Sequence, residues 1–522
     1  MPFTRGARTL VALIGAMTIL LAGCSAQTSN GSNGSAAPST SAAPTQSQEP
    51  AAPVPAGFET YYEQEVNWSK CGGGAFSCAQ VEAPIDWSDP HSNPTKIAVM
   101  MYKARGGNPM GTLLINPGGP GGSGIDLVGY APSIFGSDLL ENYNILGFDP
   151  RGVGQSDPIK CLDAEAMDRY LAASFPEVTE ETLPVMQKMS DEFAQACEQN
   201  SSEVLGHVDT QSAARDMDLL RAVVGDSKFN YLGFSYGTQL GATYAGIFPN
   251  NVGRMVLDGA IDLRLTQFEQ SKQQAVGFEN AFRAFLTDCL AGSQCPVTGT
   301  VDDAAKQVQS FLTELATNPL PTQDNGRVLT QSLAFYGLAQ PLYAQPLWPM
   351  LKDGLTQAMA HRDGTALLAL SDSYFNRSAD GTYADNQTEA FTAINCLDSR
   401  GDSDFASMQQ EANEIAQAAP TMGQFFAFGE VGCKNWPFEQ VKQDFDLSAK
   451  GAPPIMVIGT TNDPATPYSW AQGLADQLDS GFLVTHVGEG HTAYGMGSTC
   501  IMNTVDEYFV HGTVPSTDPK CS

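Results

Sequence analysis

The feature that most constrains the fold is an alternation of short β-rich runs with helical patterns between residues 80 and 260. Several of these runs are continuously apolar, as expected for strands that are buried on both faces of a parallel sheet. Residues 209–224 begin with Asp-Thr and stop before Gly225, and residues 236–248 are ended by Pro249, so both segments have helix signals. The predicted strands are 96–102, 112–116, 144–149, 229–234 and 254–258. This order predicts a doubly wound, mostly parallel α/β sheet.

A long region without strand signals follows, from residue 262 to residue 450. It is rich in Gln, Ala, Phe and Leu at helical spacing, whereas strand patterns return at 454–459 and 482–487. A short helix near 502–509 closes the chain. We therefore predict a helical insertion that splits the sheet. The expected parts are a first core segment at 57–261, the insertion at 262–450 and a second core segment at 451–522.

The N-terminus has the pattern of a targeting signal. Arg5 and Arg8 precede a short apolar stretch at 10–21, and Leu21-Ala22-Gly23-Cys24 follows at once. This indicates a lipoprotein signal peptide at 1–23, with Cys24 as the lipidated first residue of the mature chain; the alternative is an ordinary signal peptide. Residues 24–56 consist mainly of Ser, Ala, Pro, Thr, Gln, Gly and Asn, a composition typical of a disordered tether. We expect a protein on the outer face of the cell membrane, with secretion as a further possibility.

The net charge limits the class of binding partner, and the cysteine content indicates the cellular compartment. The net charge of −30 argues against nucleic acid, because phosphate binding needs a basic surface. Of 11 cysteines, ten remain when Cys24 is set aside, and an even number in an exported chain favours disulfides. Loop closure is easiest between near neighbours. It favours Cys71–Cys78, Cys161–Cys197, Cys289–Cys295, Cys396–Cys433 and Cys500–Cys521, although other pairings stay open. No cysteine or histidine cluster has zinc spacing.

A nucleophile motif stands between a predicted strand and a predicted helix. Gly233-Phe234-Ser235-Tyr236-Gly237 is G-x-S-x-G, in the strand–turn–helix context that the motif requires. Such a turn exposes the serine oxygen at the carboxyl edge of the sheet, beside a helix N-terminus. The alternative is an ordinary strand-to-helix turn. Ser235 is therefore the candidate nucleophile.

A glycine-rich loop at 116–124 follows the strand predicted at 112–116. Backbone N–H groups of such a loop supply one half of an oxyanion hole, and the residue after the nucleophile supplies the other. Gly119 and Tyr236 are the candidate donors. The loop could instead be a flexible turn or bind phosphate. The chain has no G-K-[ST] sequence in this loop, which disfavours phosphate.

A serine nucleophile needs a histidine base and an orienting carboxylate, and in this kind of sheet the chain order is serine, then acid, then histidine. His491 lies in a loop past the last predicted strand, and Asp463 lies past the preceding one. Asp258 also ends a strand and is the second candidate for the acid. The other histidines after Ser235 are His361, His486 and His511; the first falls in the insertion, the second inside a strand and the third past the final helix.

Several motifs together point to a known family. They are Gly118 to Gly122, Gly147 to Ser156 with its Asp149-Pro150-Arg151-Gly152 core, Gly233 to Gly237, Asp463 to Pro467, and Gly490-His491. In this order they resemble the secreted bacterial tripeptidyl aminopeptidases and their prolyl iminopeptidase relatives. Where iminopeptidases often have His, this chain has Pro117, which fits the tripeptidyl branch better.

The resemblance implies the α/β-hydrolase fold, with a large helical cap inserted between strands 6 and 7. It also implies a serine exopeptidase that releases short peptides, above all tripeptides, from peptide substrates with a free N-terminus, without metal or cofactor. Asp398 and Glu430 are weak candidates for binding the substrate amine. Two alternatives remain, a carboxylesterase or lipase with the same triad, and a non-catalytic surface lipoprotein.

The lipoprotein signal yields a direct test. Cys24→Ala should release the protein from membranes or block its processing, because the lipid-bearing side chain is lost. Membrane fractionation and the mass of the mature protein measure this. An unchanged distribution together with an unchanged mass would reject lipidation at Cys24.

Overall fold

A computed structural model describes residues 53–522 except 176, 325, 402 and 403. The predicted signal peptide, Cys24 and the predicted tether up to residue 52 lie outside the described residues. The described residues belong to one compact unit by their internal contacts. Among the described residues, no helix is both long enough and apolar enough to cross a membrane.

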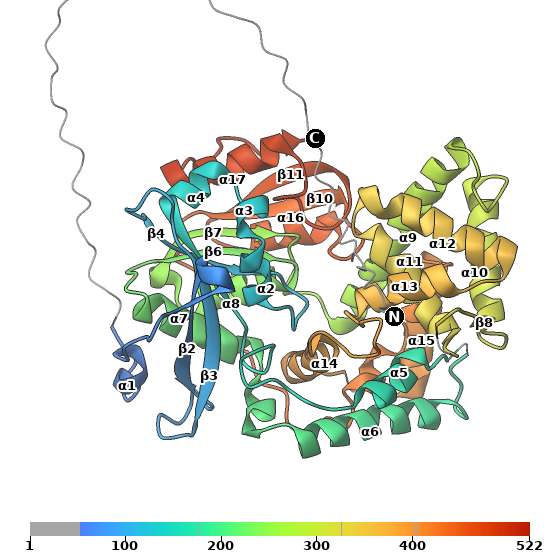
Figure 1. The fold of residues 1–522 in the computed structure, drawn as a ribbon, viewed down its shortest axis with the longest axis horizontal. Coiled ribbons are helices and arrows are strands. Elements are labelled where there is room, and N and C mark those ends of the chain that lie inside the picture. The colour runs from blue at the N-terminus through green and yellow to red at the C-terminus, as the bar shows by residue number, and fades with distance from the viewer. Residues whose placement is uncertain (1–52, 176, 325, 402–403) are drawn as a thin grey trace, which may run out of the picture. The chain divides into compact units, whose positions relative to one another are not determined.

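A ten-stranded sheet forms the centre of this unit, in the order β1-β2-β3-β5-β4-β6-β7-β10-β11-β12 (Figure 1). From β5 to β12 every neighbouring pair is parallel, whereas β1, β2, β3 and β5 pair antiparallel. The strands are β1 (Ser69–Cys71), β2 (Phe76–Pro84), β3 (Pro94–Tyr102), β4 (Gly111–Asn116), β5 (Tyr143–Phe148), β6 (Phe229–Phe234), β7 (Val252–Asp258), β10 (Ile455–Asn462), β11 (Gly481–Glu489) and β12 (Lys520–Cys521). The predicted mostly parallel α/β sheet is confirmed.

Helices cover both faces of the sheet, and the alternating side chains of each strand explain how. Leu113 and Ile115 of β4 belong to one apolar cluster, while Leu114 between them belongs to another. The first cluster includes residues of α2 (Gly124–Gly129), α4 (Ser137–Asn142) and α17 (Thr499–His511). The second includes residues of α7 (Thr210–Val223), α8 (Tyr236–Ile247) and α16 (Tyr468–Gln477). The central strands are therefore buried, because helices pack against the apolar side chains on both faces of the sheet.

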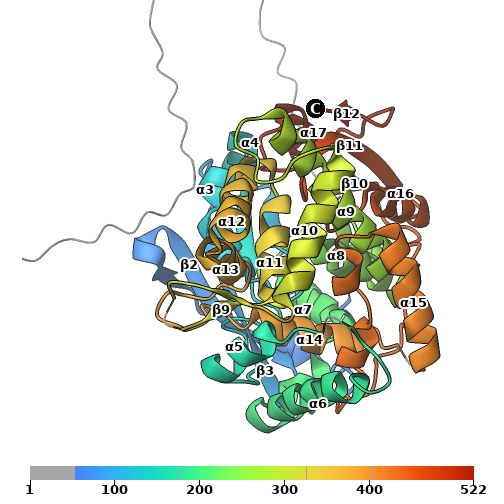
Figure 2. The ribbon, with the colours of Figure 1, turned by 90° about the vertical axis from the view of Figure 1, so that its right-hand side faces the viewer.

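The helical cap lies between β7 and β10, which are adjacent and parallel in the sheet (Figures 1 and 2). Its first helix begins with a capping box, in which Thr266 and Glu269 each bond the other's backbone N–H. Its helices are α9 (Gln267–Ala291), α10 (Val301–Leu315), α11 (Gln331–Leu342), α12 (Trp348–His361), α13 (Thr365–Tyr374), α14 (Gln387–Asp398) and α15 (Phe405–Ala418). A small antiparallel pair, β8 (Leu320–Pro321) and β9 (Val328–Leu329), lies within it. The predicted large helical cap inserted into the sheet is confirmed. It follows the sixth strand when the short edge strand β1 is left out of the count.

Two helices between β5 and β6 also lie against the cap. They are α5 (Ala164–Ala172) and α6 (Leu183–Asn200), beside the cap helices in Figure 1. Arg377 of the cap donates to both carboxylate oxygens of Asp168 in α5, at 2.7 and 2.8 Å. Part of the segment predicted as core thus contributes to the cap side of the molecule.

The Asp149-x-Arg151 motif forms a buried network of hydrogen bonds. Arg151 is fully buried and donates to both oxygens of Asp216 in α7 at 2.7 Å. Asp149 accepts from Ser123 Oγ at 2.6 Å and from Gln155 N–H at 2.9 Å, and its carbonyl accepts from Ser156 Oγ. A buried guanidinium needs a carboxylate partner to be tolerated. The motif therefore fixes the turn after β5 against α7 and against the start of α2.

The five disulfides of the structure join the pairs that the short-loop argument favours. They are Cys71–Cys78, Cys161–Cys197, Cys289–Cys295, Cys396–Cys433 and Cys500–Cys521. The fourth ties the end of α14 to the segment after a short 3₁₀ turn at Gly429–Gly432. The fifth ties α17 to β12 at the edge of the sheet.

Candidate active site

Ser235 stands in a strained turn between β6 and α8. Its φ is 55° and its ψ is −123°, a conformation that non-glycine residues rarely adopt. Its N–H donates to the carbonyl of Asp258 at 2.9 Å, which ties the turn to the end of β7. Because α8 begins at Tyr236, the first N–H groups of that helix have no acceptor within the helix. This is the strand–turn–helix arrangement that the G-x-S-x-G motif predicts.

The glycine-rich loop after β4 lies directly against this turn. A Cβ on Gly118 would lie 2.9 Å from Ser235 Cβ and 3.0 Å from the Tyr236 nitrogen, so only glycine allows the approach. Gly118 N–H donates to Asn116 Oδ1 at 2.9 Å, which holds the loop start. Gly118 thus packs directly against Ser235, a contact that the sequence did not predict. The role predicted for Gly119, the next residue, stays a prediction.

Asp463 and His491 lie together at the carboxyl ends of β10 and β11. His491 Nδ1 is 2.9 Å from both oxygens of Asp463, whose side chain is fully buried. The carboxylate also accepts from the N–H groups of Ala465 and Thr466 at 2.9 Å and of Thr492 at 3.2 Å. Such a carboxylate can fix the tautomer and orientation of the imidazole.

Thr466 is a further contact of this pair. Its hydroxyl lies 3.1 Å from Asp463 Oδ2 and 3.3 Å from His491 Nδ1. Sequence reasoning treated it only as part of the Asp463-to-Pro467 motif. Its position three residues after Asp463, in the same turn, was the available signal, since Asp side chains bond turn residues that follow them.

Charges around His491 favour the imidazolium form. Burial lowers the pKa of His491, but the charge and hydrogen bond of Asp463, with a smaller contribution from Asp258, raise it overall. Asp258 accepts from the N–H of Ala493 at 3.0 Å and of Tyr494 at 2.7 Å. Burial raises the pKa of Asp258 to about 6. Of the two candidate acids, Asp463 therefore contacts the imidazole, and Asp258 holds the backbone that follows it.

Ser235 and His491 both lie beside the end of β7, without a mutual hydrogen bond. Gly259, just after β7, lies so close to the imidazole that a Cβ there would be 3.2 Å from His491 Cε1. The preceding residue, Asp258, accepts the Ser235 N–H. Among the described residues, no hydrogen bond joins Ser235 Oγ to the His491 ring. Catalytic hydrogen bonds are often long before substrate binds.

The cap contacts the loops of both the acid and the base. The carbonyl of Tyr343, just after α11, accepts from His491 N–H at 2.8 Å, and the two rings meet edge to face at 5.4 Å. Gln274 of α9 donates to the carbonyl of Ala465 at 2.7 Å. A Cβ on Gly277 would lie 2.6 Å from the carbonyl oxygen of Pro464, so α9 packs tightly on the acid loop. No local sequence pattern marks these three residues.

The remaining candidate residues lie apart from the Asp463–His491 pair. His486 is in β11 near Thr460, His361 ends α12 and His511 ends α17. Glu430 lies beside Gly401 in the cap. Asp398 is bonded to Thr210 of the core, 2.8 Å from its N–H. In the described residues, no group of three or more His, Cys, Asp or Glu side chains is arranged to hold a metal ion.

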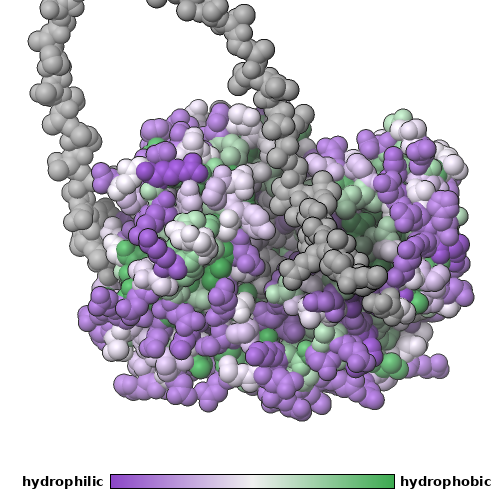
Figure 3. Space-filling model, in the orientation of Figure 1, coloured by the Kyte–Doolittle hydropathy of each residue, from purple (hydrophilic) through white to green (hydrophobic). Residues whose placement is uncertain are grey.

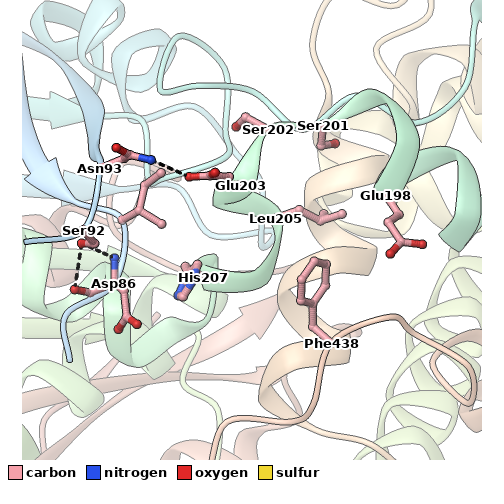
Figure 4. A pocket seen from close by; sticks show the side chains of 11 residues that line it. Asp86, Ser92, Asn93, Glu198, Ser201, Ser202, Glu203, Leu205, His207 and Phe438 are labelled. Atoms are coloured by element: carbon pink, nitrogen blue, oxygen red, sulfur yellow. Dashed lines mark hydrogen bonds between the residues drawn. The ribbon is translucent and has the colours of Figure 1, made fainter. Parts of the chain in front are cut away.

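The molecular surface shows where apolar side chains gather. In Figure 3, hydrophilic residues cover most of the visible face, while apolar residues gather in a hollow between the cap helices and the sheet. A separate pocket of about 600 Å³ lies between the β2–β3 side of the core and Phe438 (Figure 4). Its polar lining includes Asp86, Glu203 and His207, and it contains none of the predicted site residues.

Comparisons with known proteins show what the chain is similar to. The family model described as TAP-like protein matches residues 419–521, which include Asp463 and His491. Serine protease Hip1 of Mycobacterium tuberculosis (strain ATCC 25618 / H37Rv) is 35% identical over 483 residues, covering 88% of this chain and 91% of that protein. Carboxylesterase B of the same organism is 34% identical, covering 85% of this chain and 86% of that protein. Tripeptidyl aminopeptidase of Streptomyces lividans is 28% identical, covering 88% and 86%.

Among solved structures, the chain is similar to the proline iminopeptidase of Mycobacterium smegmatis, with a TM-score of 0.34 and 13% identity, covering 83% of this chain and 98% of that chain. The family assignment depends instead on the identity to Hip1 over nearly the whole chain and on the match to the TAP-like model. The sheet order and the cap between β7 and β10 agree with it. This chain therefore belongs to the tripeptidyl-aminopeptidase-like serine peptidases of the α/β-hydrolase fold.

Proposed function

We propose that this serine peptidase is an exopeptidase that releases short peptides, above all tripeptides, from substrates with a free N-terminus. The observation that carries the proposal is the Asp463–His491 pair at the edge of the sheet, under a cap that contacts both loops. A cap seated on the acid and base loops restricts access to chain ends. The relative named tripeptidyl aminopeptidase supports the same direction of cleavage.

In the proposed mechanism, Ser235 attacks the scissile carbonyl and His491 takes its proton. Asp463 holds the imidazole and stabilises the imidazolium, in keeping with the raised pKa of His491, where burial opposes and Asp463 favours the charge. The N–H groups of Tyr236 and of Gly119 stabilise the oxyanion. His491 then returns the proton to the leaving amine, and water hydrolyses the acyl-enzyme by the same route.

A carboxylesterase with the same triad is the second candidate function. The relative named Carboxylesterase B supports this function, because its sequence identity to this chain is nearly as high as that of the serine protease. The chemistry of acyl transfer is common to both, so the difference lies in what the cap accepts.

We also propose that the protein is exported and held at the outer face of the cell membrane by a lipid on Cys24. Leu21-Ala22-Gly23-Cys24 supports the lipid, and five disulfides support an oxidising compartment.

Replacement of the nucleophile tests the catalytic assignment. Ser235→Ala should remove nearly all turnover, by about 10⁶-fold in kcat, because no other group can form the acyl-enzyme. Circular dichroism should stay unchanged, since alanine leaves the buried core intact. A variant whose kcat/KM stays within about tenfold of wild type would refute Ser235 as the nucleophile.

The two carboxylates near His491 should differ in their effect. Asp463→Asn should lower kcat by about 10⁴-fold, because asparagine can hold the imidazole in the wrong tautomer. It should also lower the pKa of His491 by removing the charge that raises it, so the acid limb of kcat/KM moves to lower pH. Asp258→Asn should cost far less, since it bonds the N–H groups of Ala493 and Tyr494. A larger loss in Asp258→Asn would show that the acid is misassigned.

Acetylation of the substrate tests the free N-terminus. A tripeptidyl chromogenic substrate should lose at least about a hundredfold in kcat/KM when its amine is acetylated, because a carboxylate is then left unpaired at a cost of about 3 kcal/mol. An esterase would be indifferent to this amine. Equal cleavage of the two substrates would exclude the aminopeptidase and leave the serine hydrolase intact.

A further inference from the structure

A hydrogen-bond chain joins the cap to the residue that follows Ser235. Its cap end is Asp398, the last residue of α14. One carboxylate oxygen accepts from Thr210 N–H at 2.8 Å, and the other accepts from the Thr210 hydroxyl and, at 3.4 Å, from Gln239 of α8. Thr210 Oγ1 in turn lies 2.6 Å from the hydroxyl of Tyr236. Thr210 and Tyr236 are both buried, so these bonds are shielded from water.

The backbone around Asp398 is held on several sides. Cys396, two residues earlier, is joined to Cys433. Gln440 donates to the carbonyl of Asp398 at 2.9 Å, and Val441 N–H donates to the carbonyl of Leu397 at 2.8 Å. The carboxylate therefore projects from a fixed part of the cap onto the starts of α7 and α8.

When Asp398 is ionised, the hydrogen bonds between Tyr236, Thr210 and Asp398 have one donor-to-acceptor order. Burial raises the pKa of Tyr236 far above its ordinary value, so the phenol keeps its proton and donates it. The hydroxyl of Thr210 has a single proton, which goes to the carboxylate, and a lone pair remains to accept from Tyr236. The order is then Tyr236 to Thr210 to Asp398. An ionised acceptor strengthens the bond next to it.

We propose that Asp398 is a positioning residue for the oxyanion side of the active site, acting through Thr210 and Tyr236 on the first turn of α8. Tyr236 follows Ser235 directly, so a shift of its ring changes the direction of its own N–H. Catalytic donors must be placed to within a fraction of an ångström. The inference rests on the roles proposed above for Ser235 and Tyr236. It also gives Asp398 a different role from the amine binding considered in the sequence analysis.

Protonation of Asp398 should break the chain. Burial raises the pKa of Asp398 to about 7; the bonds from Thr210 oppose this rise, and the charge of Asp209 adds to it. Asp209 at the start of α7 and Tyr236 of α8 are the titratable groups that act on it from the core. A neutral carboxyl is a weaker acceptor and can donate to Thr210. The Thr210 hydroxyl then turns its own proton toward the Tyr236 oxygen, so the Tyr236 proton loses its acceptor. Activity should therefore fall below pH 7 more steeply than protonation of His491 alone predicts.

Ionisation of Asp398 should favour activity but lower the stability of the fold. Because the pKa in the folded protein is raised above the ordinary value of 3.8, the folded state binds the proton more tightly than the unfolded chain. Ionisation of Asp398 thus lowers the free energy of unfolding as the pH rises from 3.8 to about 7. The charge serves the positioning of Tyr236 at the expense of stability, and the two effects can be measured separately.

The test uses the full chain with Asp398→Asn and Tyr236→Phe, and Glu389→Gln as the matched control. Glu389 is also on α14 with a pKa raised by burial to about 7, but no side-chain hydrogen bond joins it to the core among the described residues. Rates with a p-nitrophenyl acyl ester, a tripeptidyl substrate and its N-acetylated form are followed from about pH 5 to about pH 9. Melting temperatures are measured at pH 8.

Asp398→Asn should lower kcat about ten- to hundredfold on all three substrates, with little change in KM. At acid pH, the activity of this variant should fall with the protonation of His491 alone. Its melting temperature at pH 8 should be no lower than that of wild type. Tyr236→Phe keeps the ring and the N–H but loses the hydroxyl, and should reproduce the loss in kcat even if Asp398→Asn does not fold. Glu389→Gln should keep the wild-type kcat and acid limb.

Three results would overturn the proposal. The first is a wild-type kcat and acid limb in Asp398→Asn. The second is a loss confined to the free-amine substrate and to KM, which would make Asp398 the amine-binding residue. The third is full kcat in Tyr236→Phe. Failure of the proposed exopeptidase would instead appear as equal cleavage of free and acetylated substrates by wild type, whatever the variants do.

Discussion

The active site depends on one buried guanidinium. All five N–H groups of Arg151 are used: three bonds go to the carbonyls of Pro84, Ile85 and His207, and two to the carboxylate of Asp216. These partners come from the end of β2, from the segment before α7 and from α7 itself. A charge removed from water in this way tolerates little displacement, since each lost bond leaves a buried polar group unpaired. The start of α7, which carries Thr210, is fixed as a result.

The same turn also orders the loop beside the nucleophile. Asp149, two residues before Arg151, accepts from Ser123, whose hydroxyl also caps the first turn of α2. The glycine-rich loop is therefore held at its far end by Asp149 and at its near end by Asn116. The strained backbone of Ser235 persists because its neighbours on both sides are fixed in this way.

Much of this arrangement could be predicted from the sequence, for identifiable reasons. Strands such as β4 and β6 are apolar throughout because helices cover both of their faces, and a continuous run is easily recognised. β2 was missed because it lies near the antiparallel edge, where exposed residues such as Gln80 and Glu82 interrupt the apolar pattern. Asp463 and His491 could be found because chain order and strand ends determine their place.

Other contacts of the site have no signature along the chain. Tyr343, Gln274 and Gly277 reach the acid and base loops from helices far away in sequence, so only the packing of the cap reveals them. The bond between Asp398 and Thr210 spans 188 positions. Long-range contacts of this kind follow from tertiary structure and not from local propensity. The close approach of Gly118 to Ser235 could not be predicted either, because a run of glycines does not indicate which one packs against the turn.

The packing of α9 and Tyr343 on the catalytic loops has a consequence for how such enzymes diversify. In this chain the cap and the core meet at these contacts: α9 packs on the backbone of Pro464, and the carbonyl of Tyr343 accepts from His491 N–H. A change in the cap that alters which substrates fit will therefore also alter how the base is oriented. A cap from a related hydrolase, grafted onto this core, would therefore have to supply the contacts made by Gly277 and Tyr343. Without these contacts, the grafted protein would lose turnover as well as its former specificity.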